Sequence, residues 1–579
     1  TDVKQTLKYE SEQPNSLYDP NGSFQSINRR YDIVYGDVML NFNYNINRFD
    51  IAATVGWTGR YENMNNIRVS TNGGLVTENW FDLNASRYTP SSTLQRMELL
   101  KTGYMGTLSL GWDNYLFLEL TGRQERSSTL KDQSFFYPSA NLSFLFTQAF
   151  HMPSWWNYGK LRLSYGIVGN APETYTANIV YEQGSDNGFT WNTIPSSWGN
   201  ADIHPEKKYE YEIGLESKFL NNRLGIDISY YNNRVKDQIL STPQPSTSGV
   251  KNVLMNVGEV ANRGWDISIS ATPILTRDFR WDLTANYGVY KNKVVKLADG
   301  VPYLEILNSG GSGIKIQAVE GQPMGDIYAQ VPQVNENGEY LVSDKGLYLN
   351  QTELQKVGNI NPAGVGGLFN SFSYKNVFLD FSIDFRIGGD VINEMNQYAT
   401  AVGLTPESLK YRDTEHGGLS YYYPGDNNSS GIPVQVDPST GAGPNGEIIY
   451  HDGIILPGVV ASTGERNTRI IPAGYYYNTT YNWGTEAEQL TYRHSVFDNS
   501  YVKLRELTIG YQFPEKMISK LGLGRLSVSV FGRNLFYFYK ALKNYDAESS
   551  VGTSWANQAT VGSSTTATRS FGVSLRASF

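Results

Sequence analysis

The sequence offers few residues whose types and spacing suit catalysis. Its five histidines, His151, His204, His416, His451 and His494, lack the spacing of metal ligands. There is no cysteine to supply a thiolate. Residues 441–446 match the glycine pattern of a dinucleotide-binding loop, but neither a strand before them nor a helix after them completes that site. We therefore expect no catalytic, metal-binding or cofactor-binding residue, and no enzyme activity.

Aromatic residues in the longest polar stretch suit binding better than catalysis. Rings with hydroxyl tips stack on sugar faces or grip a partner protein. The alternative is that the same rings pack the loop against itself, and the sequence leaves both roles open. Loops of this length are uncommon unless they are functional. The candidate contacts for substrate or for a covering partner are Tyr421, Tyr422, Tyr423, Tyr475, Tyr476, Tyr477 and Trp483.

Charged residues alternate with apolar residues in several segments. Residues 377–387 carry apolar side chains at every odd position, and Asp380, Asp384 and Arg386 lie between them. This period of two predicts an extended strand with one face for lipid and one for water. Plug contact, a substrate path and simple solvation are all open roles for the polar face. The residues expected to face a wet interior are Asp266, Asp282, Asp380, Asp384 and Arg386.

The length allows three or four ordinary soluble domains or one very large closed sheet, and the composition favours strands and turns. The 579 residues include 56 glycines and 41 tyrosines, and aromatic residues make up 13%. No stretch of about 18 apolar residues occurs, so no transmembrane helix is predicted. The net charge of −8 without a basic run argues against nucleic acid as a partner.

The connections between the predicted strands alternate in length. Short ones are expected at 46–48, 112–114, 151–159, 220–223, 273–278, 375–376 and 514–524. Long ones are expected at 60–94, 124–135, 169–205, 239–253, 296–364, 390–498 and 541–568. This alternation is typical of a transmembrane antiparallel β-barrel with short periplasmic turns and long extracellular loops. We expect about 15 strands, with residues 1–36 as an extracellular loop and residues 390–498 as the longest loop.

Residues 569–579 are expected to form the closing strand. Phe571 and Phe579 lie on its apolar face, and the terminal aromatic resembles the assembly signal of outer-membrane barrels. With 15 strands, the first and the last run in the same direction, and two such strands cannot close an antiparallel barrel. The count therefore predicts an odd number of further strands before residue 1.

Several stretches together resemble the SusC/RagA-like family of TonB-dependent outer-membrane transporters. The resemblance extends over nearly the whole chain, and its motifs appear in the family's order. One departure is Asp546-Ala547-Glu548, where the family has Asp-Pro-Glu, so the local turn is in question. The motifs lie at 161–170, 205–215, 256–265, 320–328, 366–375, 501–514, 531–536 and 569–579.

The resemblance implies a barrel of about 22 strands around a plug, so about seven strands would be missing. It also implies a plug and a TonB-contacting segment before the barrel, and neither matches this sequence. The implied function is active import of an oligomeric nutrient, glycan or peptide, with a SusD-like surface lipoprotein as lid and the TonB complex supplying force. Outer-membrane lipid surrounds such a barrel, and a dimer of transporter–lipoprotein pairs is one expected assembly. The alternatives are a TonB-dependent receptor for a siderophore or other small chelate without a lid, and a passive pore or adhesion barrel.

Overall fold

A computed structural model describes residues 2–11, 21–131, 133–186, 188–245, 247, 249–309, 313–425, 431–482, 491–550, 554–562 and 567–578. Its contacts divide the chain into two units. The first unit comprises Thr1–Glu216, Tyr230–Ala261 and Ala298–Val301. The second comprises Ser217–Ser229, Asn262–Leu297 and Pro302–Phe579.

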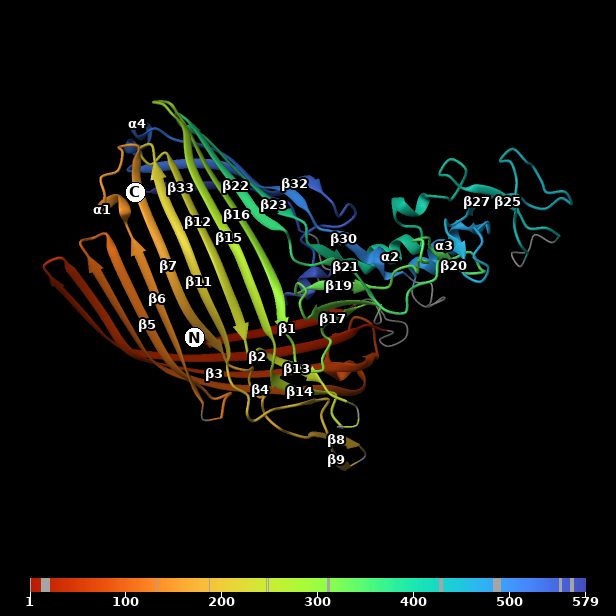
Figure 1. Cartoon of the computed structure of the whole chain (residues 1–579), viewed down its shortest axis with the longest axis horizontal. Helices are drawn as coiled ribbons and strands as arrows, with labels where there is room; N and C mark the ends of the chain where they lie inside the picture. The colour runs from red at the N-terminus through yellow and green to blue at the C-terminus, as the bar shows by residue number, and fades with distance from the viewer. Residues whose placement is uncertain are drawn as a thin grey trace. The chain divides into compact units, whose positions relative to one another are not determined.

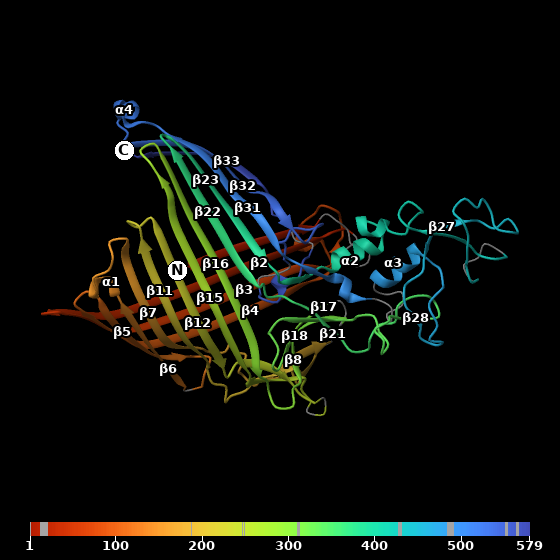
Figure 2. The same ribbon diagram turned by 45° about the horizontal axis from the view of Figure 1, so that its top comes forward.

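One antiparallel sheet of 16 strands dominates the fold, and its strands follow one another in chain order. Figure 1 shows β5, β6 and β7 of the first unit side by side, and Figure 2 shows β22, β23 and β31 of the second. The strands are β1 (Asp2–Ser11), β2 (Ser23–Ile46), β3 (Phe49–Leu75), β4 (Ser86–Trp112), β5 (Leu116–Ser127), β6 (Ser134–Phe144), β7 (Trp156–Asn170), β11 (Glu206–Phe219), β12 (Leu224–Lys236), β15 (Glu259–Leu275), β16 (Phe279–Lys296), β22 (Gly364–Tyr374), β23 (Val377–Ile387), β31 (Tyr501–Gln512), β32 (Arg525–Lys540) and β33 (Ser570–Ser578).

Short turns join these strands in pairs, and their residue types explain them. Asn47 turns β2 into β3 with a positive φ of 54°, and Asn221 and Asn222 do the same between β11 and β12 with φ of 55° and 62°. Asparagine adopts this left-handed backbone more readily than most residues. Two of the short connections hold helices, α1 (Phe146–Ala149) and α4 (Glu515–Ile518).

The sheet has an apolar face and a polar face. In β33, Phe571, Val573 and Leu575 are 70 to 74% exposed in the isolated chain, as side chains directed at lipid would be. Pairing with β32 places Leu575 opposite Val528 and Arg576 opposite Ser527. Each face therefore continues from strand to strand, and the name polar face is used below for the face that carries Asp380, Ser527 and Arg576. Phe579 lies outside the described residues.

The strands near the N-terminus are much longer than the sequence predicts. Residues 1–36, expected to be loop, contain β1 and the first part of β2, and the expected loop 60–94 contains the ends of β3 and β4. The pairing of β3 with β4 extends from Phe49↔Trp112 to Leu75↔Ser86. The expectation was wrong because apolar and polar residues do not alternate regularly in these strand parts: Ile33, Val34 and Tyr35, for example, follow one another. They therefore lack the pattern by which a lipid-spanning strand is detected.

The strand count also corrects the argument from direction. With 16 strands in place of about 15, β1 and β33 run in opposite directions in an antiparallel order. The count therefore no longer requires an odd number of further strands. The missing strand in the prediction was β1, whose segment Asp2–Ser11 is mostly polar.

The long connections carry small folded elements of their own. In the first unit these are β8 (Glu182–Asp186), β9 (Phe189–Thr193), β10 (Ser197–Trp198), β13 (Ile239–Pro243) and β14 (Asn252–Asn256). In the second unit, β17 (Tyr303–Ser309), β18 (Ile314–Val319), β19 (Asp326–Ala329) and β21 (Gln355–Asn359) form a four-stranded sheet. The short strand β20 (Leu341–Val342) pairs with β28 (Val459–Val460).

The segment from residue 390 to residue 498 is called the long loop. It contains β24 (Asp390–Ile392), α2 (Glu394–Ala401), β25 (Leu419–Tyr422), β26 (Val434–Gln435), β27 (Tyr450–Ile454), β28 (Val459–Val460), β29 (Ile471–Pro472), α3 (Ala473–Tyr481) and β30 (Val496–Asp498). Both views show α2, α3 and β27 beyond the point where β23 ends. Leu347, Ile454, Leu456 and Ile471 form a buried cluster there, so this part has a core of its own. No helix among the described residues is long and apolar enough to cross a membrane.

Candidate functional site

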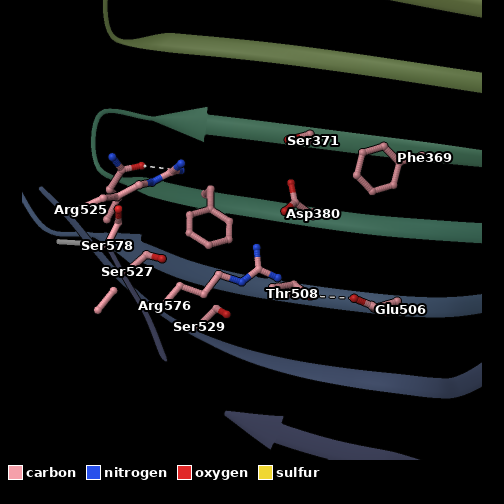
Figure 3. Close-up of a pocket in the computed structure, with 13 residues that line it drawn as sticks. Phe369, Ser371, Asp380, Glu506, Thr508, Arg525, Ser527, Ser529, Arg576 and Ser578 are labelled. Atoms are coloured by element: carbon pink, nitrogen blue, oxygen red, sulfur yellow. Dashed lines mark hydrogen bonds between the residues drawn. The ribbon is translucent and has the colours of Figure 1, made fainter. Parts of the chain in front are cut away.

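The polar face of the second unit holds a pocket of about 590 Å³. Strand pairing builds it: Asp380 on β23 lies opposite Ser371 on β22 and Thr508 on β31, and Ser527 on β32 lies opposite Arg576 on β33. Figure 3 shows these side chains around the hollow, with the Arg576 guanidinium directed toward Thr508. The pocket lies near the strand ends that short turns connect, because β31 ends at Gln512 and β32 begins at Arg525.

Two further residues predicted to face a wet interior, Asp282 and Asp266, lie on the polar face, and Asp282 is hydrogen-bonded there. The Asp282 carboxylate accepts hydrogen bonds from Arg280 Nε at 2.6 Å and from Thr272 Oγ1 at 2.7 Å. The Asp266 carboxylate lies close to Gly288, where a Cβ atom would come within 3.1 Å of Asp266 Oδ1. Glycine at position 288 therefore leaves room for this carboxylate between β15 and β16.

The other two predicted residues of this set hold neighbouring segments. The Asp384 carboxylate accepts a hydrogen bond from Arg505 Nε at 3.1 Å. Arg386, at the end of β23, donates from its guanidinium to the carbonyls of Gly388 at 3.2 Å and Ile360 at 3.0 Å. Asp384 and Arg386 therefore act within the chain as anchoring groups, whereas Asp380 borders the pocket.

An ion network that the sequence did not predict joins residues 541–550 to the sheet. The Glu548 carboxylate accepts from Lys503 Nζ at 2.5 Å and from Arg505 Nη1 at 2.8 Å. Lys503 is only 2% exposed. Burial alone would raise the pKa of Glu548, but the hydrogen bonds from Arg505 and Lys503 lower it to about 2. The one signal in the sequence is that Lys503 and Arg505 are two residues apart on a strand, which suits one shared anion.

The turn at Asp546-Ala547-Glu548 forms without the proline of the family pattern. The Asp546 carboxylate accepts hydrogen bonds from the Glu548 backbone N–H at 3.0 Å and from the Tyr537 hydroxyl at 2.6 Å. The buried Asn499 side chain donates to the Ala547 carbonyl at 2.9 Å. These bonds fix the turn that presents Glu548 to its two cations.

Three of the tyrosines expected to contact substrate or a lid are buried within the long loop. Tyr421, Tyr423 and Tyr477 are 1%, 6% and 3% exposed. The Tyr421 hydroxyl donates to Asp452 at 3.1 Å, and its ring stacks on Tyr450 with centroids 5.5 Å apart. These three rings pack the loop against itself, because segments that are distant in the sequence converge on them.

The remaining aromatic candidates are less enclosed. Tyr475 and Tyr476 are partly buried against the cluster around Leu347, and Tyr422 is half-buried. Tyr475 also borders a pocket of about 300 Å³ together with Lys345 and Arg469. Trp483 lies outside the described residues. Within the described ranges, no three His, Asp or Glu side chains form a cluster that could hold a metal ion.

The sequence matches a known family over its first part. Residues 1–327 match the family described as TonB dependent receptor-like, beta-barrel. The chain is 24% identical over 494 residues to TonB-dependent receptor P3 of Formosa agariphila, covering 78% of this chain and 42% of that protein. It is 30% identical over 247 residues to TonB-dependent receptor SusC of Bacteroides thetaiotaomicron, covering 39% of this chain and 24% of SusC.

Solved structures share the fold. The RagAB peptide transporter matches with a TM-score of 0.65 and 18% sequence identity, over 93% of this chain and 55% of that chain. The chain therefore spans less than half of these curated relatives and about half of that solved structure. Because the family match covers more than half of the 579 residues, this chain belongs to the TonB-dependent receptor β-barrel family of outer-membrane proteins and is similar to SusC.

Proposed function

We propose that this chain is the barrel portion of an active importer that carries an oligomeric nutrient, glycan or peptide, across the outer membrane. Its relatives are TonB-dependent receptors, and the chain is similar in fold to the RagAB peptide transporter. In this proposal the TonB complex supplies force through a part of the protein outside this chain. A SusD-like surface lipoprotein serves as the lid.

The observation that carries the proposal is the pocketed polar face of the sheet. A face with a hollow of about 590 Å³ bordered by arginine, carboxylate and serine side chains suits a hydrated, hydrogen-bonding cargo. The folded long loop adds support for a lid, because it presents a packed surface in place of loose chain.

Uptake and co-purification test this proposal. Cells that express the full-length protein are expected to accumulate oligosaccharide or oligopeptide, and deletion of TonB should abolish this uptake. Extraction in mild detergent is expected to recover a surface lipoprotein, and the mass of the complex would distinguish a single pair from a dimer of pairs. Uptake of iron chelates alone would favour the small-chelate receptor, whereas uptake that persists without TonB would favour a passive pore.

A further inference from the structure

A second pocket, of about 300 Å³, lies in the long loop and away from the strands of the sheet. Its border combines Lys345, from the connection between β20 and β21, with Tyr423, Arg469 and Tyr475 of the long loop. The strand β29 also borders it and pairs with β27, and both views show β27 beyond the point where β23 ends. Loops alone supply the described lining, and the polar face of the sheet contributes nothing to it.

The fold of the loop fixes the position of Arg469 in this pocket. The buried Asn467 side chain donates to the Leu456 carbonyl at 2.8 Å and accepts the Arg469 backbone N–H at 3.0 Å, and within the described ranges the guanidinium forms no ion pair. The Arg469 stem lies against Gly346, which has a φ of 87°, and a Cβ atom there would come within 3.4 Å of Arg469 Cδ. Glycine at position 346 therefore permits the left-handed turn and leaves room for the arginine beside the turn that carries Lys345.

The polar residues around the pocket are mainly hydrogen-bond donors. They are Lys345, Arg469, Tyr423 and Tyr475, and no described lining residue carries a carboxylate. An ammonium and a guanidinium only donate, whereas a phenol can also accept. Burial is the main cause that raises the pKa of Tyr423, and the positive charge of Arg469 opposes it, so this charge acts close to the Tyr423 hydroxyl. A ligand must therefore bring acceptors, and an oxyanion brings acceptors alone.

The rest of the lining is apolar and limits the size of the ligand. Ile470 and Ile471 are 4% and 3% exposed, and Pro433 and Pro472 border the same hollow. Small-molecule pockets measure about 300 to 1,000 Å³, so this one admits little more than a single ring. The C–H face of a sugar ring packs well on proline and on the Tyr475 ring. A neutral sugar would bring hydroxyl donors to the two cations, and a linear acidic side chain would leave most of the apolar wall uncovered.

We propose that this pocket binds one sugar residue that carries a carboxylate, which Arg469 holds while the ring packs against Pro472 and Tyr475. A planar guanidinium matches a carboxylate with two parallel hydrogen bonds. The inference goes beyond the proposed import function, because it assigns a site on the long loop and leaves the cargo of the barrel open. The acidic sugar belongs to a polysaccharide in the medium or to the lipopolysaccharide of the outer membrane, and the two sources share this chemistry.

Calorimetry on the full-length protein in detergent tests this site. The probes are trimers of galacturonate and of mannuronate, the methyl esters of both, and tetraglutamate. We expect at least one trimer to bind about tenfold more tightly than its own ester, which has the same rings without the charge. Arg469→Gln should remove this difference by weakening binding of the acid alone. Lys345→Glu, at an exposed turn position, should do the same because the new carboxylate competes for Arg469.

Arg466→Gln is the matched control, since Arg466 is an exposed arginine of the same loop and lies outside the described lining of the pocket. Three results would overturn the inference: no preference for either acid over its ester, equal losses in Arg466→Gln, or tetraglutamate binding as tightly as the trimers. If Arg469→Gln disturbs the loop, Lys345→Glu decides the question. Deacylated lipopolysaccharide that binds in place of a trimer would support the site and identify the membrane as the source. Binding in detergent needs no TonB, so these results do not depend on the import test.

Discussion

Replacing Glu548 by alanine should release residues 541–550 from the sheet. The substitution leaves Lys503, which is only 2% exposed, without its carboxylate partner. Arg505 keeps a single carboxylate partner, Asp384. Breaking a buried ion pair costs about 3 to 5 kcal/mol. The Glu548 side chain is 30% exposed and the Lys503 ammonium retains the Tyr537 ring at 4.7 Å, so we expect a smaller loss, about 2 to 3 kcal/mol.

Hydrogen exchange measured by mass spectrometry on the full-length protein in detergent is the assay. A loss of about 2 to 3 kcal/mol corresponds to exchange about 30- to 150-fold faster in residues 541–550. Residues 377–387, within β23, should exchange at the original rate. Glu336→Ala, at an exposed loop position, is the control and should change nothing. Unchanged exchange in Glu548→Ala would refute the reasoning, as would an equal change in the control.

The pH dependence gives the same prediction a second form. The pKa of Glu548 is about 2 in the folded protein and about 4.5 as a reference for the unfolded chain. Because the folded pKa is lower, the stabilisation is complete above pH about 4.5 and is lost as the pH falls toward 2. Protection of residues 541–550 should therefore decline in this window. Glu548→Gln should remove this part of the decline.

Three further predictions concern the faces, the long loop and the chain end. Ile383→Arg, on the apolar face, should lower the free energy of unfolding by about 2 to 4 kcal/mol if the site is near the bilayer centre, as measured by urea unfolding from vesicles. Ser382→Arg, on the polar face, should be tolerated. Equal losses at the two positions would mean that the faces are misassigned. Tyr421→Ala should lower the stability of the long loop by about 3 to 5 kcal/mol, as for other buried aromatic rings, and Tyr421→Phe by about 1 kcal/mol because the hydrogen bond to Asp452 is lost. Both losses are measured as increased protease cleavage within residues 390–498. A protease-resistant long loop in Tyr421→Ala would contradict the packing role. Deletion of Phe579 should reduce the yield of protein in the outer membrane while assembled molecules still bind cargo, and a normal yield would argue against an assembly role.

The sequence predicts the lipid-spanning strands well because a bilayer imposes a strict pattern on them. Residues 377–387 alternate over their whole length, and β23 has these same bounds. The outer parts of β2, β3 and β4 lack this alternation, as the consecutive residues Ile33, Val34 and Tyr35 show. Only pairing with neighbouring strands defines them, and pairing is not visible in one segment taken alone.

The candidate site was predictable only in part, for a related reason. Alternation within one strand placed Asp380 on the polar face, but the pocket depends on five strands whose register brings Arg576 to the same hollow. The Glu548 network joins residues more than 40 positions apart. Tyr421 shows the opposite case. The sequence left a binding role open for its ring, but in the fold the ring is buried against Tyr450 and Ile470, which are distant in the sequence.

The length of β3 and β4 has a mechanical consequence. Each strand has 27 residues and so measures about 90 Å, whereas crossing the bilayer takes about 9 to 11 residues. Well over half of this hairpin must therefore lie in water, where pairing with β2 makes it resistant to bending. A stiff ribbon of this kind holds its tip at a defined height above the lipid.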